Sequence, residues 1–161
     1  AFTMSICNLR PESRGEVKIN SSDPTQLPKI IPNYLSTDSD KKIAIDSIKV
    51  ARKIADADSL KKYILEEYVP GPAFESDEEL LEAAKNNSQS IYHPVGTCKM
   101  GNDIDSVVDE KLKVHGVSGL RVVDASIMPE LVSGNTNAPT MMIAEKASEM
   151  ILADYDLSLT K

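Results

Sequence analysis

The sequence changes character near Asn87, and this change constrains the fold more than any other feature. The stretch before it contains segments with helical or strand periodicity, separated by prolines. Residues 93–140, by contrast, hold both histidines and five of the seven glycines. The same stretch also has the densest content of candidate motifs. Proline suits the first turn of a helix, so a last helix is predicted from Pro139 to about Ala153.

Three helices are predicted in the earlier stretch: residues 40–57, 59–68 and 77–86. In the first, small and apolar side chains recur at i, i+3 and i+4, and Asp38 or Ser39 can act as its N-cap. The third begins at Ser76, and Glu79 three residues later completes the pattern of a capping box.

The predicted strands are residues 2–9, 16–20, 33–35 and 119–124. Residues 16–20 alternate polar and apolar side chains, as a half-buried strand does. Three prolines keep residues 23–33 extended or irregular. The strand at 119–124 follows a glycine and ends in the carboxylate of Asp124.

The composition excludes several classes of partner. The formal net charge is −7, from 18 Lys and Arg against 25 Asp and Glu. Phosphate binding needs clustered cations, so no nucleic-acid partner is expected. No apolar run approaches the roughly 18 residues of a membrane span.

Neither histidine has a Cys or carboxylate neighbour at zinc spacing, so no metal is expected. Cys7 and Cys98 are predicted to be two separate buried thiols.

Three segments carry residues that could perform chemistry. His93 precedes a proline, which favours extended backbone, and imidazole can exchange a proton near neutral pH. Asn135 lies in a turn before the last helix, where exposed amide N–H groups attract anions and electron-rich ring atoms. Asp124 ends a predicted strand, the position at which nucleotide folds meet their ligands. Taken singly, each has an ordinary structural explanation: packing of His93, N-capping by Asn135, Thr136 or Asn137, and capping of a turn by Asp124.

Together these segments closely resemble the C-terminal part of the glucose–methanol–choline (GMC) flavin oxidoreductases. The matching residues are Tyr92-His93-Pro94-Val95-Gly96-Thr97-Cys98-Lys99-Met100-Gly101, Val107-Val108-Asp109, Val114 through Pro129, Ser133 through Thr140 and Ile143 through Ala147. The first half also fits, at Arg10 through Val17, Ser22 through Pro24 and Asn33 through Leu35. The resemblance covers nearly the whole chain, and the motifs look most like those of the insect glucose dehydrogenase branch.

The resemblance implies an α+β fold. Residues 1–90 would be part of the substrate-binding domain, with antiparallel strands and covering helices. Residues 91–161 would form an active-site segment that returns to the FAD-binding domain with its last strand and helix. His93 occupies the family's catalytic histidine position, and Asn135 its partner position, which is His in some members and Asn in others. The residues that lie where the family contacts FAD are Asp124, Ala125, Asn137, Pro139 and Thr140.

The resemblance further implies an enzyme that oxidises an alcohol or sugar hydroxyl by hydride transfer to flavin N5. His93 would accept the hydroxyl proton, and Asn135 would stabilise the forming alkoxide. Two alternatives remain open. One is a hydroxynitrile lyase-type enzyme on the same scaffold, and the other is a non-enzymatic binding product of the fold.

One departure from the family pattern matters for the cofactor. The family holds the ADP part of FAD on a Gly-x-Gly-x-x-Gly turn, and the seven glycines of this chain include no Gly-x-Gly pair. We therefore expect a C-terminal fragment or one subunit of a split enzyme, whose partner is the remainder with the N-terminal FAD-binding domain. Alone, the chain is expected to be inactive and to hold FAD weakly.

Overall fold

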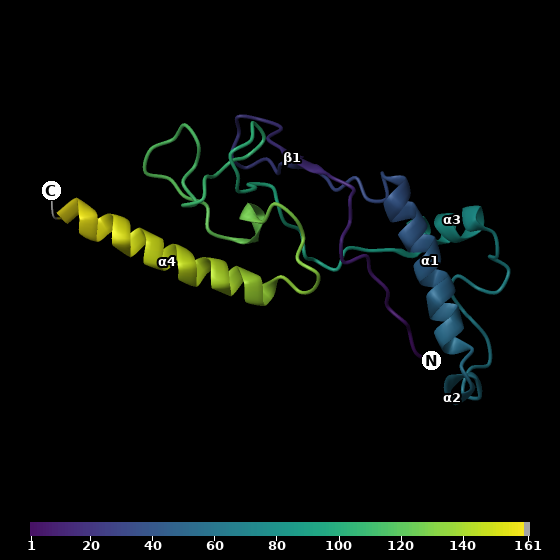
Figure 1. Ribbon diagram of the computed structural model, residues 1–161. Coiled ribbons are helices and arrows are strands. Elements are labelled where there is room, and N and C mark those ends of the chain that lie inside the picture. The colour runs from purple at the N-terminus through teal and green to yellow at the C-terminus, as the bar shows by residue number, and fades with distance from the viewer. Residues whose placement is uncertain (160–161) are drawn as a thin grey trace. The chain divides into compact units, whose positions relative to one another are not determined.

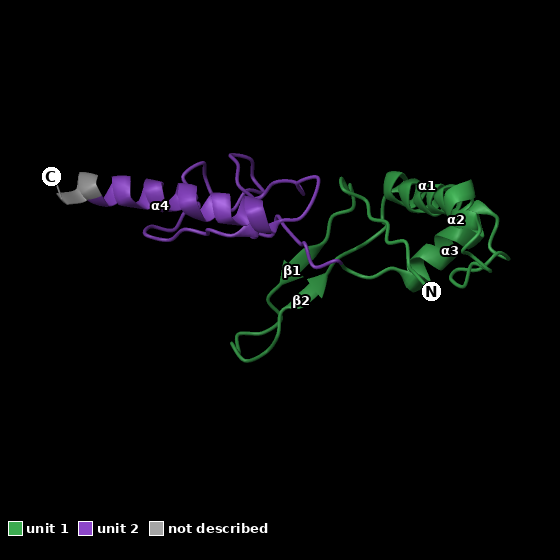
Figure 2. Cartoon of the chain, turned by 90° about the horizontal axis from the view of Figure 1, so that it is seen from below, with its two compact units in different colours: residues 1–90 green, residues 91–161 purple. Residues whose placement is uncertain are grey.

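The computed structural model describes residues 1–159, with side-chain surroundings up to Tyr155. The chain divides into two compact units, residues 1–90 and 91–161 (Figure 2). The first unit contains β1 (Glu16–Lys18), β2 (Lys29–Ile31), α1 (Asp38–Ala55), α2 (Asp58–Lys61) and α3 (Asp77–Asn87). The second contains the short 3-10 helix η1 (Ala125–Ile127) and the long helix α4 (Asn137–Leu159) (Figure 1). Helices together with a small antiparallel sheet confirm the predicted α+β class.

The sheet of the first unit is a two-stranded hairpin. β1 and β2 pair antiparallel, with Val17 opposite Ile30. β1 lies inside its predicted range, but the strand predicted at 33–35 is wrong. Asn33 and Leu35 both have a φ of +54°, a left-handed conformation that a strand does not contain. The strand predicted at 2–9 is also wrong, because no other segment of the described chain pairs with it.

α1 and α3 follow their predicted ranges closely and pack against each other. Ser76 and Glu79 form the predicted capping box at the start of α3. The N-cap of α1 is Thr37, whose side chain accepts a hydrogen bond from the backbone N–H of Asp40. The cap therefore lies just before the two residues that the sequence suggested. Within the first unit the helices pack on one another, and none of them packs on the hairpin.

The helix predicted over residues 59–68 is reduced to the single turn of α2. The apolar side chains beyond it, Tyr63, Leu65 and Tyr68, are all largely exposed. A helix of this length needs a packed apolar face to be stable in water. The prediction was wrong because these side chains form no buried apolar face in the first unit.

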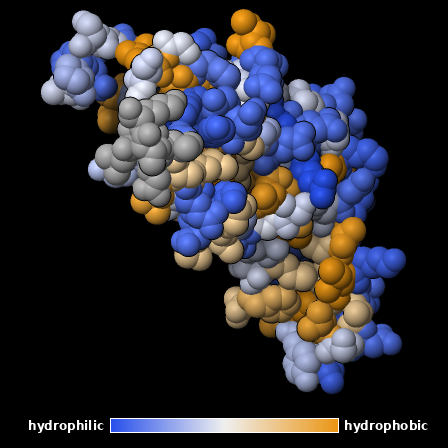
Figure 3. Space-filling view, turned by 60° about the vertical axis from the view of Figure 1, so that its left-hand side comes forward, coloured by the Kyte–Doolittle hydropathy of each residue, from blue (hydrophilic) through white to orange (hydrophobic). Residues whose placement is uncertain are grey.

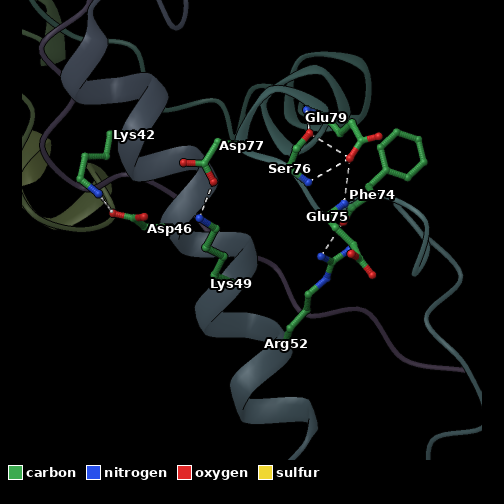
Figure 4. A network of polar contacts seen from close by, with 9 residues as sticks. All are labelled: Lys42, Asp46, Lys49, Arg52, Phe74, Glu75, Ser76, Asp77 and Glu79. Atoms are coloured by element: carbon green, nitrogen blue, oxygen red, sulfur yellow. Dashed lines mark hydrogen bonds and ion pairs between the residues drawn. The ribbon is translucent and has the colours of Figure 1, made fainter.

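Arg52 on α1 holds the irregular segment between α2 and α3. Its guanidinium donates to Glu67 at 3.0 Å, to the carbonyl of Phe74 at 2.7 Å and to the carbonyl of Gly71 at 3.1 Å. Figure 4 shows Arg52 directed toward Phe74, together with the neighbouring ion pairs Lys42–Asp46 and Lys49–Asp77. Exposed ion pairs contribute little to stability. Arg52 differs from them because it also bonds two main-chain carbonyls, and it therefore tethers the segment.

Asp40, in the first turn of α1, is the one buried charged residue among those described. Its carboxylate accepts from Asn8 Nδ2 at 3.0 Å and from the backbone N–H groups of Glu12 at 3.0 Å and Ser13 at 2.7 Å. Burial opposes the charged form, but hydrogen bonds from Ser13, Glu12 and Thr37 outweigh it and hold the pKa of this carboxyl below its ordinary value. Asp40 thus fixes the irregular N-terminal segment to α1.

The core of the second unit lies where α4 packs on η1. Its buried members are Val108, Leu112, Ile127, Met128, Ile143 and Ala147. Asp154, near the end of α4, accepts from both Lys113 and Arg121 at 2.6 Å. These two cations, Lys113 first, lower the pKa of the Asp154 carboxyl. They also tie the long helix to the loops beneath it.

The strand predicted at 119–124 is not formed. Arg121 makes one isolated bridge with Lys113, and the other pairings in this unit are also single bridges. A strand requires a neighbour along its whole length to satisfy its backbone groups, and the loops of this unit supply only one-residue pairings. The last helix is longer than predicted, since it starts two residues before Pro139 and runs to Leu159.

Burial is sparse in both units. Nine apolar residues count as buried within the described chain. On the face drawn in Figure 3, exposed apolar side chains (orange) lie among polar ones (blue). Both cysteines are free and separate, as predicted, but Cys98 is half-buried and Cys7 is exposed. No helix of the described chain is both long and apolar enough to cross a membrane.

Candidate active site

The side chain of His93 meets the turn that precedes α4. Its Nδ1 lies 3.0 Å from the hydroxyl oxygen of Thr136, in a partly buried contact between residues 43 positions apart. Tyr92 has a φ of +61°, which is uncommon for a residue other than glycine. This left-handed residue turns the chain directly before the histidine. The contact brings two of the three segments singled out in the sequence into one place.

Two main-chain hydrogen bonds fix the loop after His93 to η1. The N–H of Cys98 donates to the carbonyl of Ser126 at 3.0 Å, and the N–H of Met100 donates to the carbonyl of Ile127 at 2.8 Å. These bonds run between main-chain atoms, so they hold the backbone of the loop whatever its side chains do. His93 is therefore followed by a loop whose backbone is fixed to η1.

The same hydrophobic core supports the loop and α4. Val95 packs against this core, which Ile143 of α4 also joins. Gly96 has a φ of +88°, and a Cβ atom there would lie 3.3 Å from the carbonyl oxygen of Met128. The turn therefore requires glycine. Because one core carries both segments, their relative placement in this unit is fixed by packing.

Thr136 occupies the N-cap position of α4, yet its hydroxyl does not cap the helix. An N-cap hydroxyl usually accepts from the N–H of the second or third helical residue. The third residue here is Pro139, which has no N–H, and His93 is the hydrogen-bond partner of the Thr136 hydroxyl within the described chain. The Thr136 carbonyl accepts from the N–H and the hydroxyl of Thr140, at 3.0 and 2.7 Å. The main chain holds the turn, and the hydroxyl is left for His93.

Asn135 directly precedes Thr136 and is exposed. Its side chain makes no hydrogen bond to any described residue, so it does not cap α4. His93 is half-buried, with Nδ1 bonded to Thr136 and Nε2 without a partner in the described chain. Two adjoining segments therefore leave one imidazole nitrogen and one carboxamide without a hydrogen-bond partner in the described chain. When a hydroxyl loses its proton, a group such as this imidazole can accept the proton, and a group such as this carboxamide can donate a hydrogen bond to the oxygen that becomes negative.

Asp124 is exposed and caps η1. Its Oδ1 accepts a hydrogen bond from the N–H of Ser126 at 2.7 Å. The Oδ1 atom of Asp124 is therefore explained by capping of η1, the structural role that the sequence also allowed. The assignment of Asp124 and Ala125 to FAD stays a prediction.

The first turn of α4 fits the polar edge of a flavin ring. The backbone N–H groups of Asn137 and Ala138 donate to no acceptor within residues 1–159, and the exposed Asn137 side chain is likewise unbonded there. A helix N-terminus carries partial positive charge and favours electron-rich atoms. Pro139 and Thr140 complete this turn. The donors present therefore suit a flavin ring.

The remaining candidates in this unit are explained structurally. His115 lies in an exposed loop with Nε2 3.0 Å from the carbonyl oxygen of Gly101, which agrees with a role in loop closure. No group of three or more His, Cys, Asp or Glu side chains in the described part of the chain could hold a metal ion. The residue that sequence reasoning missed is Thr136, which we considered only as a helix cap. The available signal was the proline three residues later.

The sequence family described as GMC oxidoreductase matches residues 11–144. This chain belongs to the GMC oxidoreductase family. The GMC chain is 52% identical to an alcohol dehydrogenase (acceptor) of Pseudomonas putida and 45% identical to an oxygen-dependent choline dehydrogenase of Shigella flexneri. Each alignment covers 98% of this chain and 28% of the relative. The GMC chain thus spans about 28% of the length of these curated relatives.

Solved structures agree with the family assignment. A pyridoxine 4-oxidase from Mesorbium loti matches with a TM-score of 0.82 at 35% identity, over 88% of this chain and 28% of that chain. An FAD-dependent oxidoreductase from Chaetomium thermophilum matches with a TM-score of 0.86 at 30% identity, over 92% and 26%. The predicted GMC resemblance is confirmed, and the narrower likeness to insect glucose dehydrogenases stays a prediction.

Proposed function

We propose that this GMC chain is part of an FAD-dependent enzyme that oxidises an alcohol or sugar hydroxyl. The observation that carries the proposal is the His93 imidazole, bonded to Thr136 with Nε2 open, where the unbonded Asn135 directly precedes Thr136 in the chain. The relatives named above include an alcohol dehydrogenase and a choline dehydrogenase. None of those named is a lyase, and no observation favours the lyase alternative.

In this proposal His93 accepts the hydroxyl proton at Nε2, because Nδ1 is occupied by Thr136. Loss of that proton and of a hydride from the adjoining carbon converts the C–O single bond to a carbonyl. Asn135 donates a hydrogen bond to the oxygen while negative charge builds on it, and such stabilisation is usually a large term in catalysis. Bound FAD supplies the hydride acceptor, a role that no side chain fills.

The residues that would hold FAD are divided between two places in the second unit. Asn137, Pro139 and Thr140 would meet the flavin ring at the first turn of α4. Asp124 and Ala125 would contribute toward the ribityl and pyrophosphate region. The phosphate-binding turn would come from the remainder of the enzyme, which the length of the relatives indicates. We therefore also propose that this remainder is the chain's principal partner.

The test is to mix the purified whole enzyme with a series of alcohols and sugars without oxygen while recording its visible spectrum. Oxidation of a hydroxyl transfers a hydride to the flavin, so its yellow colour should bleach with at least one substrate. A lyase would keep its colour while it converted substrate. A protein that binds no flavin, and is colourless from the start, would contradict the proposal outright.

A further inference from the structure

We propose that Thr136 is a positioning residue that fixes the tautomer and the orientation of His93, so that Nε2 carries the lone pair. The inference rests on the proposed function, in which His93 takes a hydroxyl proton. It adds a residue that does not touch the substrate and acts only through the histidine. The observation behind it is the 3.0 Å contact between His93 Nδ1 and the Thr136 hydroxyl.

The direction of this hydrogen bond decides what His93 can do. A neutral imidazole has one N–H and one lone pair, and a hydroxyl can either donate or accept. If Nδ1–H donates to the Thr136 oxygen, the lone pair lies on Nε2 and can accept a proton. If the hydroxyl donates instead, Nε2 carries the hydrogen and cannot act as a base.

Only the first direction lets Nε2 take up and release a proton with no change in the hydrogen bond to Thr136. When Nε2 gains a proton, Nδ1 keeps its N–H and the bond to Thr136 persists, so the ring need not rotate. In the reverse arrangement the lone pair lies on Nδ1, so protonation puts the ring's second hydrogen there, and the Thr136 hydroxyl must turn from donor to acceptor. The donor direction from His93 to Thr136 therefore keeps the ring fixed in both protonation states.

The local sequence explains why the Thr136 hydroxyl is free for this task. Pro139 offers no N–H at the third helical position, and the Thr136 hydroxyl does not bond the N–H of Ala138 at the second position, the other usual capping partner. Two hydrogen bonds from Thr140 to the Thr136 carbonyl hold the backbone in place. The hydroxyl then stands on a fixed backbone and is directed at the imidazole, as a positioning group requires.

The experiment compares Thr136→Val, which removes the hydroxyl and keeps the shape, with Thr136→Ser, which keeps the hydroxyl, in the whole enzyme. We expect Thr136→Val to lower kcat on the order of ten- to a hundredfold, by analogy with the loss of the hydrogen-bond partner that orients a metal-binding histidine. KM should change little, because the hydroxyl does not touch the substrate. Thr136→Ser should restore kcat to within about threefold of the parent. FAD content should be equal in all three.

A second readout is independent of turnover. Nitrogen-15 NMR of the histidine rings reports which nitrogen carries hydrogen, and loss of a signal in His93→Ala assigns the His93 ring. We expect hydrogen on Nδ1 in the parent enzyme and in Thr136→Ser, and a mixture of tautomers in Thr136→Val. Hydrogen on Nε2 in the neutral parent enzyme would overturn the inference, even if a variant failed to fold.

The kinetic outcomes separate this inference from the proposed function. Should His93→Ala turn over normally, the role of His93 as base fails. If His93→Ala is inactive but Thr136→Val keeps the parent kcat and the parent tautomer, only the inference about Thr136 is overturned. The proposed role of His93 as base then still holds. A Thr136→Ser variant as impaired as Thr136→Val would also overturn it, because the hydroxyl would then not be the group that matters.

Discussion

The Nδ1 of His93 and the hydroxyl of Thr136 lie 3.0 Å apart, although 43 residues separate them in the sequence. The distance is maintained by one small core, on which the histidine loop rests through Val95 and α4 through Ile143. The proposed base and the group that we propose orients it therefore depend on the same packing. The site can be tested one side chain at a time, because neither His93 nor Asn135 belongs to that core.

Asn135→Ala should lower alcohol oxidation on the order of a hundredfold or more, because a donor to the developing alkoxide is lost. The exposed Asn135 side chain bonds to no described residue, so folding and FAD content should be unchanged. Steady-state kinetics in the whole enzyme measure the effect. Asn102→Ala, at another exposed asparagine of the same unit, is the matched control and should be neutral. An Asn135→Ala enzyme as active as this control would remove Asn135 from the mechanism.

Arg52→Met should loosen the segment between α2 and α3. The guanidinium bonds the carbonyls of Gly71 and Phe74, and since it is partly exposed we expect a loss of about 1–2 kcal/mol in local stability. Limited proteolysis should then cut residues 62–75 several times faster. Lys42→Met removes an exposed ion pair from the same helix and should leave the cleavage rate unchanged. Equal rates in the two variants would show that Arg52 is no tether.

Asp40→Asn should lower the free energy of unfolding by about 2–4 kcal/mol near neutral pH, because a buried carboxylate with several donors is replaced by an amide. The pKa of the folded carboxyl lies below its ordinary value of 3.8. Its contribution is therefore fully present above about pH 4 and is lost as pH falls through the folded pKa. Denaturant unfolding at several pH values should show that stability falls less steeply in acid in Asp40→Asn than in the parent, because other carboxyls with a lowered pKa, such as Asp154, remain. Asp58→Asn, at an exposed carboxylate, should behave like the parent.

The isolated residues 1–161 should bind FAD weakly. The first turn of α4 offers donors to the ring, but the sequence has no Gly-x-Gly pair to cradle the pyrophosphate. Titration followed by flavin fluorescence should show no stoichiometric complex at micromolar concentration. Tight binding by this chain alone would mean that it holds the phosphates in a way that the sequence does not reveal.

Local signals predicted the parts of the fold that local interactions determine. The capping box at Ser76 and Glu79 and the apolar spacing of α1 are set within a few residues, and both were confirmed. The strand at 119–124 and the helix beyond Lys61 were predicted from apolar residues, but the first segment has no neighbouring strand and the second no buried face. Val122 and Val123 pack against the core without a neighbouring strand, and Tyr63, Leu65 and Tyr68 stay exposed.

The residues of the candidate site likewise fall into those that the sequence indicated and one that only the tertiary structure reveals. His93 and Asn135 stand out in the sequence through the resemblance to the GMC family, and their roles remain predictions. Thr136 could not be found, because its partner is 43 residues away and an N-cap threonine ordinarily serves its own helix. Pro139 removes one of the two usual capping partners, but only the tertiary structure identifies the group that the Thr136 hydroxyl meets instead.

The most direct measurement of the central claim is the rate at which an alcohol reduces the flavin of the whole enzyme without oxygen, in the parent and in His93→Ala. Loss of the general base should slow reduction by roughly a hundredfold or more, with FAD content unchanged. His115→Ala, at the other histidine of the second unit, should reduce at the parent rate. A His93→Ala enzyme that reduced its flavin as fast as His115→Ala would contradict the account, because the proton would then leave by a route that does not involve His93.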